Sequence, residues 1–120
     1  MTYKETLSWM YARLPMYQKS GKSAYTAKLD NIQRLAEYLQ HPEQQFKSIH
    51  VAGTNGKGSS SHMLASILQE AGYTVGLYTS PHLKDFRERI RINGKPVDRK
   101  FVTEFITGHW AYFETGHLSF

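Results

Sequence analysis

The 120-residue chain has no cysteine, which excludes disulfide bonds and thiolate metal sites. It has no apolar run near the roughly 20 residues that a membrane-spanning helix needs. The first residues lack the basic segment and apolar core of a secretion signal. Internal repeats and low-complexity tracts are also missing. These absences are compatible with a reducing compartment, and we expect a cytoplasmic protein with a single domain-sized core.

Positive charge is in excess, with 15 Lys and Arg against 10 Asp and Glu and a formal net charge of +5. Such an excess suits anionic partners, namely nucleotides, polyanionic metabolites or nucleic acid, but an ordinary solvated basic face explains it equally well. Basic residues are dense only in 84–91, where Asp85 and Glu88 interrupt them. The pattern is weak evidence for a nucleic-acid groove, which steep salt dependence of binding would reveal.

Hydrophobic periodicity predicts alternating helices and strands. Helices are expected over 2–14, 27–40 and 63–71, with Gly72 placed as a helix C-terminal cap and 17–26 as a polar loop. Short strands are expected over 48–52 and 74–78, and this strand–helix–strand order predicts parallel pairing with a right-handed crossover. Asn93-Gly94 predicts a hairpin turn after 89–92, and Asp98 can cap a last helix. The fold class is therefore α/β.

A glycine-rich segment directly follows the first predicted strand: Gly53-Thr54-Asn55-Gly56-Lys57-Gly58-Ser59. Glycines let backbone N–H groups surround phosphates, the next helix adds its positive end, and a lysine reaches the outer phosphates. The general P-loop pattern is only partly met, since Val51 stands where a glycine is usual and Gly58 where Ser or Thr is usual. The alternative is a glycine-rich turn with a surface lysine.

The glycine after Lys57 has a chemical consequence, because the hydroxyl usual at that position binds Mg²⁺. Another oxygen must then serve, since Mg²⁺ prefers oxygen ligands. Ser80 is a candidate, because it follows the second predicted strand at the end where parallel sheets bind ligands. Composition alone favours the alternative, a plain Ser-Pro turn at Ser80-Pro81.

Three motifs in order resemble the folylpolyglutamate synthase/dihydrofolate synthase family of Mur-ligase-like enzymes: 53–59, 76–83 (Gly-Leu-Tyr-Thr-Ser-Pro-His-Leu) and 88–94 (Glu-Arg-Ile-Arg-Ile-Asn-Gly). The resemblance extends to the N-terminal helix and Leu29-Asp30-Asn31-Ile32. It implies a three-layer αβα P-loop nucleotide-binding domain of the Mur ligase type, of which residues 1–120 would be the N-terminal part. A C-terminal glutamate-binding domain would be absent.

The resemblance also implies a reaction. Such enzymes use ATP and Mg²⁺ to phosphorylate a folate or dihydropteroate carboxylate, and the amine of L-glutamate then attacks the acyl phosphate. By position, Thr54, Asn55, Gly56, Lys57 and Gly58 would hold the ATP phosphates, with Lys57 acting on the outer ones and Ser59 adding a hydroxyl. Ser80 would bind Mg²⁺, which reverses the preference for a plain turn. Thr26, Ala27 and Lys28 would lie in a loop that contacts the pterin substrate, although the family often has glycine where this chain has Lys28.

The family's remaining metal-binding glutamate and histidine and its modified lysine would lie beyond Phe120. We therefore expect little or no ligase activity from these 120 residues alone. The expected partners are small molecules, with no nucleic acid or membrane, and a monomer at full length. A stand-alone nucleotide-binding module without ligase activity is the alternative, since a phosphate-binding loop alone does not separate kinase, ATPase and ligase.

Overall fold

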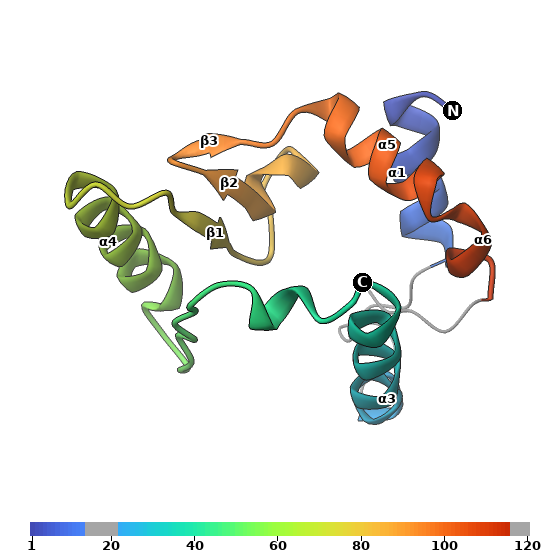
Figure 1. Ribbon diagram of the computed structural model, residues 1–120, viewed down its shortest axis with the longest axis horizontal. Helices are drawn as coiled ribbons and strands as arrows, with labels where there is room; N and C mark the ends of the chain where they lie inside the picture. The colour runs from blue at the N-terminus through green and yellow to red at the C-terminus, as the bar shows by residue number, and fades with distance from the viewer. Residues whose placement is uncertain (14–21, 116–120) are drawn as a thin grey trace. The chain divides into compact units, whose positions relative to one another are not determined.

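The structure is a computed structural model that describes residues 1–13 and 22–115, with the backbone alone for 22–28. The chain forms two compact units, one from Met1–Ser48 with Val102–Phe120 and the other from Ile49–Phe101. Figure 1 follows the elements along the chain. Across the described ranges, none of the helices has the length and apolar character needed to cross a membrane.

The first unit is helical. It contains α1 (Tyr3–Arg13), α3 (Lys22–Tyr38), the short 3₁₀ helix Pro42–Gln44, most of α5 (Arg99–Gly108), and α6 (Trp110–Phe113). Its buried apolar side chains are Met10, Val102, Ile106 and Phe113. The ring of Trp9 on α1 lies 4.8 Å from that of Trp110 on α6. Side chains from both ends of the chain therefore make this core.

A capping box begins α1, as the Thr2 and Glu5 pair in the sequence allows. The backbone N–H of Thr2 donates to the Glu5 carboxylate (2.7 Å), and the N–H of Glu5 donates to the Thr2 hydroxyl (3.1 Å). The Thr2 N–H, more than any other contact, holds the pKa of Glu5 below its ordinary value. The predicted N-terminal helix is thus confirmed.

The second predicted helix begins earlier than expected. α3 starts at Lys22, so the prediction of a polar loop is wrong for residues 22–26, whereas residues 17–21 lie outside the described ones. Thr26, Ala27 and Lys28 therefore belong to a helix and not to a loop. No glycine or proline occurs between Gly21 and Pro42, which explains the longer extent. α3 ends near His41-Pro42 as predicted, where Gln40 and His41 adopt left-handed φ angles of 64° and 54°.

The second unit holds an antiparallel sheet in the order β1 (Gly76–Tyr78), β2 (Ile90–Ile92), β3 (Lys95–Pro96). Leu77 pairs with Arg91, and Ile92 pairs with Lys95. Asn93 and Gly94 form the predicted turn, and their φ angles of 49° and 80° are those of a type I′ hairpin. The Asn93 side chain also accepts the Val75 N–H at 2.8 Å, which extends the contact between the first two strands.

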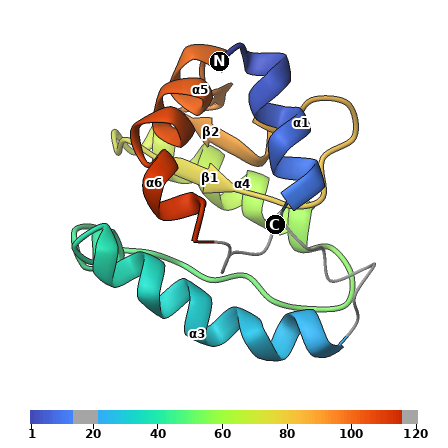
Figure 2. The ribbon, with the colours of Figure 1, turned by 90° about the vertical axis from the view of Figure 1, so that its right-hand side faces the viewer.

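Helix α4 (Lys57–Glu70) packs beside β1, as Figures 1 and 2 show. It ends in a Schellman motif, in which the Tyr73 N–H donates to the Leu68 carbonyl and the Gly72 N–H to the Gln69 carbonyl. Gly72 has the left-handed φ of 98° that this motif needs, which confirms its predicted capping role. The Gln69 side chain donates to the Asn93 carbonyl (3.3 Å), so the end of α4 is attached to the hairpin.

The predicted parallel unit is wrong for the described part of the chain. Residues 48–52 form no strand, and all the described pairs between 76 and 96 are antiparallel. A β-strand is defined by hydrogen bonds to a neighbour, and 48–52 has none from those three strands. The α/β fold class itself is confirmed, because α4 covers a small sheet in the same unit.

Candidate functional site

The glycine segment ends in an open helix N-terminus. Gly56 is the N-cap of α4 with φ 75° and ψ 7°, and the Ser60 N–H donates to its carbonyl at 3.0 Å. The N–H groups of Lys57, Gly58 and Ser59 therefore have no partner inside the helix, and no side chain caps them. Residues 52–60 are all exposed. Several backbone donors thus face solvent at the positive end of a 14-residue helix.

Two glycines of this segment serve different purposes. Gly56 lies in the left-handed region, where a side chain strains the backbone. Gly58 has no such φ, and a Cβ at either position would meet no atom within 4 Å. The free protein therefore gives no steric reason for glycine at 58. Its missing side chain instead leaves the space in front of the donors open to a ligand.

The charge around these donors suits an anion. The first turn of α4 carries no acidic side chain, and Lys57 is exposed beside the unpaired N–H groups. The positive helix end and the ammonium group act in the same direction on a phosphate. A carboxylate side chain in place of Lys57 or Gly58 would oppose this attraction of a phosphate.

Ser80 lies in the turn that joins β1 to β2, and its side chain is exposed. The turn is closed at its base by the Thr79 N–H, which donates to the Arg89 carbonyl at 3.0 Å. After α4 the chain turns at Gly72 and continues as β1, which lies beside the helix (Figure 1). The glycine segment and Ser80 thus belong to the same compact unit.

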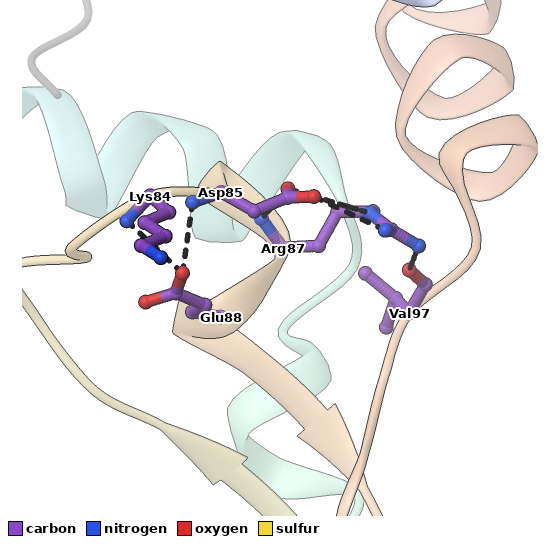
Figure 3. A network of polar contacts seen from close by, with 5 residues as sticks. All are labelled: Lys84, Asp85, Arg87, Glu88 and Val97. Atoms are coloured by element: carbon purple, nitrogen blue, oxygen red, sulfur yellow. Dashed lines mark hydrogen bonds and ion pairs between the residues drawn. The ribbon is translucent and has the colours of Figure 1, made fainter.

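The Glu88 carboxylate holds this turn through three backbone groups. It accepts the N–H of Leu83 (3.0 Å), Lys84 (3.0 Å) and Asp85 (2.8 Å), and Figure 3 shows it beside Lys84 and Asp85. These bonds, with Leu83 contributing most, keep the pKa of Glu88 below its ordinary value. Glu88 is therefore an anion whose acceptor sites are directed at the turn.

Two further contacts attach the turn. Asp85 caps the 3₁₀ helix Phe86–Arg89 and pairs with the Arg87 guanidinium (3.1 Å), which also donates to the Val97 carbonyl (3.3 Å; Figure 3). Arg89, only 6% exposed, donates from Nε to the His82 ring at 2.7 Å. His82 thus helps to fix the residues after Ser80.

The remaining predicted residues are not brought into this site by described contacts. Thr26, Ala27 and Lys28 lie on α3 in the first unit, and their side chains are outside the described part. Over 1–13 and 22–115, His, Asp and Glu side chains do not gather in any group of three that could hold a metal ion. The described residues therefore offer a row of exposed backbone N–H groups beside Lys57 and an exposed hydroxyl at Ser80, but not a complete metal site.

Comparison with known proteins identifies the chain's relatives. No family model matches it. It is 45% identical over 104 residues to the dihydrofolate synthase/folylpolyglutamate synthase of Bacillus subtilis, covering 87% of this chain and 23% of that protein. The chain belongs to the folylpolyglutamate synthase/dihydrofolate synthase family.

Solved structures of the family agree. A folylpolyglutamate synthase in complex with AMPPCP and folate matches 96% of this chain with a TM-score of 0.82 and 36% identity. The synthase from Thermotoga maritima matches 94% with a TM-score of 0.79 and 35% identity. The chain spans about a quarter of the length of these relatives (23%, 24% and 26% of the three). The predicted fold class is thereby confirmed as that of the matched part of these synthases.

The sequence interpretation missed the polar network around Glu88. Its signal was present as Asp85-Phe86-Arg87-Glu88, the spacing of a capping box, in which the first side chain caps a turn and the acid three residues later reaches back. The same spacing occurs in Thr2 to Glu5. Arg89 and His82 had no comparable signal, because their contact depends on how the turn folds back.

Proposed function

We propose that this chain is the ATP-phosphate-binding part of a ligase that joins L-glutamate to a folate or dihydropteroate carboxylate and works in the cytoplasm. The observation that carries the proposal is the open row of N–H groups at the start of α4, with Lys57 beside it. Support comes from the family, in which one matching synthase is a complex with folate and AMPPCP, an ATP analogue.

The residues of the glycine segment act together in this proposal. Thr54, Asn55 and Gly56 hold the ATP phosphates with Lys57 and Gly58, and the N–H groups of Lys57, Gly58 and Ser59 donate to phosphate oxygens. The Lys57 ammonium offsets negative charge on the outer phosphates, from which the terminal phosphoryl group passes to the carboxylate as ADP leaves. The Ser59 hydroxyl adds a donor.

The described residues fit a magnesium ion as a partial site. Gly58 cannot supply a side-chain oxygen, whereas the exposed Ser80 hydroxyl can. Mg²⁺ commonly takes one or two protein oxygens and completes its shell with phosphates and water, so one hydroxyl is a chemically reasonable contribution. Bound there, the cation would neutralise phosphate charge. Thr26, Ala27 and Lys28 stay a proposed substrate contact, now on a helix.

Isothermal titration calorimetry of this chain with AMPPCP tests the proposal. Lys57→Ala is expected to weaken AMPPCP binding by about 10- to 100-fold, the loss typical of one charge-assisted hydrogen bond. Lys95→Ala, an exposed lysine on β3, is the matched control and should stay within about twofold. Absence of AMPPCP binding, or equal effects of the two substitutions, would contradict the proposal.

A second measurement concerns the ligase reaction itself. Incubation of the chain with ATP, L-glutamate and a folate is expected to give little or no product. Robust turnover would show that these residues already form a complete enzyme, against the proposed partial role.

A further inference from the structure

The turn that carries Ser80 is attached on both sides of this residue to the same short segment. Before Ser80, the Thr79 N–H donates to the Arg89 carbonyl, and the Thr79 hydroxyl lies 3.5 Å from the Glu88 carbonyl. After Ser80, the His82 ring accepts from Arg89. The backbone around Ser80 is therefore fixed by the two residues that precede β2.

Most of the hydrogen bonds that hold the turn after Ser80 come from one side chain, Glu88. The Glu88 carboxylate accepts three consecutive N–H groups, those of residues 83–85, at 2.8 to 3.0 Å. A carboxylate has two oxygens with about four acceptor sites, so it can satisfy all three donors. An amide has one acceptor oxygen and two N–H donors, and the latter would face the backbone N–H groups. Alanine satisfies none.

We propose that Glu88 is a positioning residue, whose carboxylate holds the backbone of residues 83–85 so that the Ser80 hydroxyl is presented to a divalent cation bound with the nucleotide. This inference rests on the proposed function of Ser80. Glu88 itself contacts neither the cation nor the nucleotide. Its effect passes through the turn.

The proposed effect is separable from a general loss of structure. The phosphate-binding donors depend on Gly56 and on the first turn of α4, none of which contacts Glu88 through a described hydrogen bond. The turn also keeps its second attachment through Asp85, Arg87 and Val97. Loss of the carboxylate should therefore loosen Ser80 and leave binding of the metal-free nucleotide unchanged.

The test measures AMPPCP affinity by calorimetry with Mg²⁺ and with EDTA, and the ratio of the two dissociation constants is the magnesium gain. Glu88→Ala and Glu88→Gln are compared with wild type, with Ser80→Ala and with Glu70→Ala, an exposed glutamate at the end of α4. Wild type and Glu70→Ala should show a gain of at least about fivefold, the lower end of typical coupling between two ligands.

Ser80→Ala and Glu88→Ala should lose most of this gain, and Glu88→Gln should fall between them and wild type. All five proteins should bind AMPPCP in EDTA within about twofold of one another, because the N–H groups of α4 are untouched. Amide hydrogen exchange gives a second readout. Residues 83–85 should exchange faster in both Glu88 variants than in Glu70→Ala.

The outcomes separate the two proposals. No gain in wild type, or a full gain in Ser80→Ala, refutes the metal role of Ser80 and with it this inference. A second outcome overturns only the positioning role of Glu88. In that outcome Ser80→Ala loses the magnesium gain, but the Glu88 variants keep the full gain or show unchanged amide exchange at residues 83–85. If circular dichroism shows that Glu88→Ala unfolds, Glu88→Gln decides. If Glu88→Gln keeps the full magnesium gain, or binds AMPPCP more weakly than wild type in EDTA, the positioning role is overturned. If its magnesium gain is reduced and its AMPPCP affinity in EDTA equals that of wild type, the role is supported.

Discussion

Substituting alanine at Gly56 and at Gly58 should have opposite effects on stability, although only one residue separates the two positions. Gly56 adopts φ 75°, in the left-handed region, and a Cβ there has open space. The cost of Gly56→Ala is therefore backbone strain without a clash, about 1–2 kcal/mol. Gly58 lies inside α4 without a positive φ, so Gly58→Ala should stabilise by about 0.5 kcal/mol by restricting the unfolded chain.

These two effects differ by about 2 kcal/mol, which urea denaturation resolves. With a slope of about 2 kcal/mol per molar for a small protein, the unfolding midpoints of the two variants should lie about 1 M apart, with wild type between them. Equal midpoints would refute the left-handed conformation at Gly56 or the helical one at Gly58.

The Gly58→Ala variant should be more stable than wild type but should have a lower affinity for nucleotide. Its extra methyl group would stand in front of the open donors, so the stabilised Gly58→Ala variant should bind AMPPCP more weakly than wild type in calorimetry. A Gly58→Ala variant that is more stable and binds equally well would show that glycine at 58 has no part in ligand approach.

Four substitutions test local features. Thr2→Ala removes the cap of α1 and should lower the free energy of unfolding by about 1 kcal/mol in urea. Ile106→Ala empties a core position that is 7% exposed and should cost about 2–5 kcal/mol, whereas Ile32→Ala, 52% exposed, should change stability by less than about 0.5 kcal/mol in the same assay. The pKa of Glu88 is lowered from 4.5 on folding, so its stabilisation is present above that pH and disappears as pH falls through the folded-state pKa. The stability difference between wild type and Glu88→Gln should shrink accordingly in acid, and a difference independent of pH would contradict the bonds to 83–85.

Local signals predicted much of the secondary structure correctly. The end of α4 at Gly72 and the turn at Asn93-Gly94 were both predicted, because each depends on a backbone conformation that one or two residues impose. Helix α5 begins at Arg99, directly after the predicted cap Asp98. Such features need no information about distant parts of the chain.

Pairing between strands was predicted poorly for the opposite reason. Whether 48–52 forms a strand depends on a neighbour that its own composition does not specify, and the described chain gives β1 an antiparallel partner in β2 instead. The early start of α3 at Lys22 reflects the weak helix preferences of short polar stretches, which flanking structure can override.

For the site, the sequence predicted candidate residues but not the contacts that hold them. Lys57 and Ser80 were chosen from spacing and resemblance, and their roles remain predictions. The sequence placed Glu88 among the basic residues of 84–91 and in the 88–94 motif, but not in the turn, because its contacts there depend on a chain reversal that brings 83–85 to it.

Helix α4 also fixes the direction in which its first N–H groups point. Gly56 begins it, and the Schellman motif with the Gln69 contact holds its other end against the hairpin. Each residue of a helix adds about 1.5 Å of length and about 100° of rotation. One residue inserted in the middle of α4 would turn these first N–H groups by more than a quarter of a circle relative to β1. The orientation of these N–H groups relative to β1 therefore depends on the number of residues in α4, and not only on the contacts at its two ends.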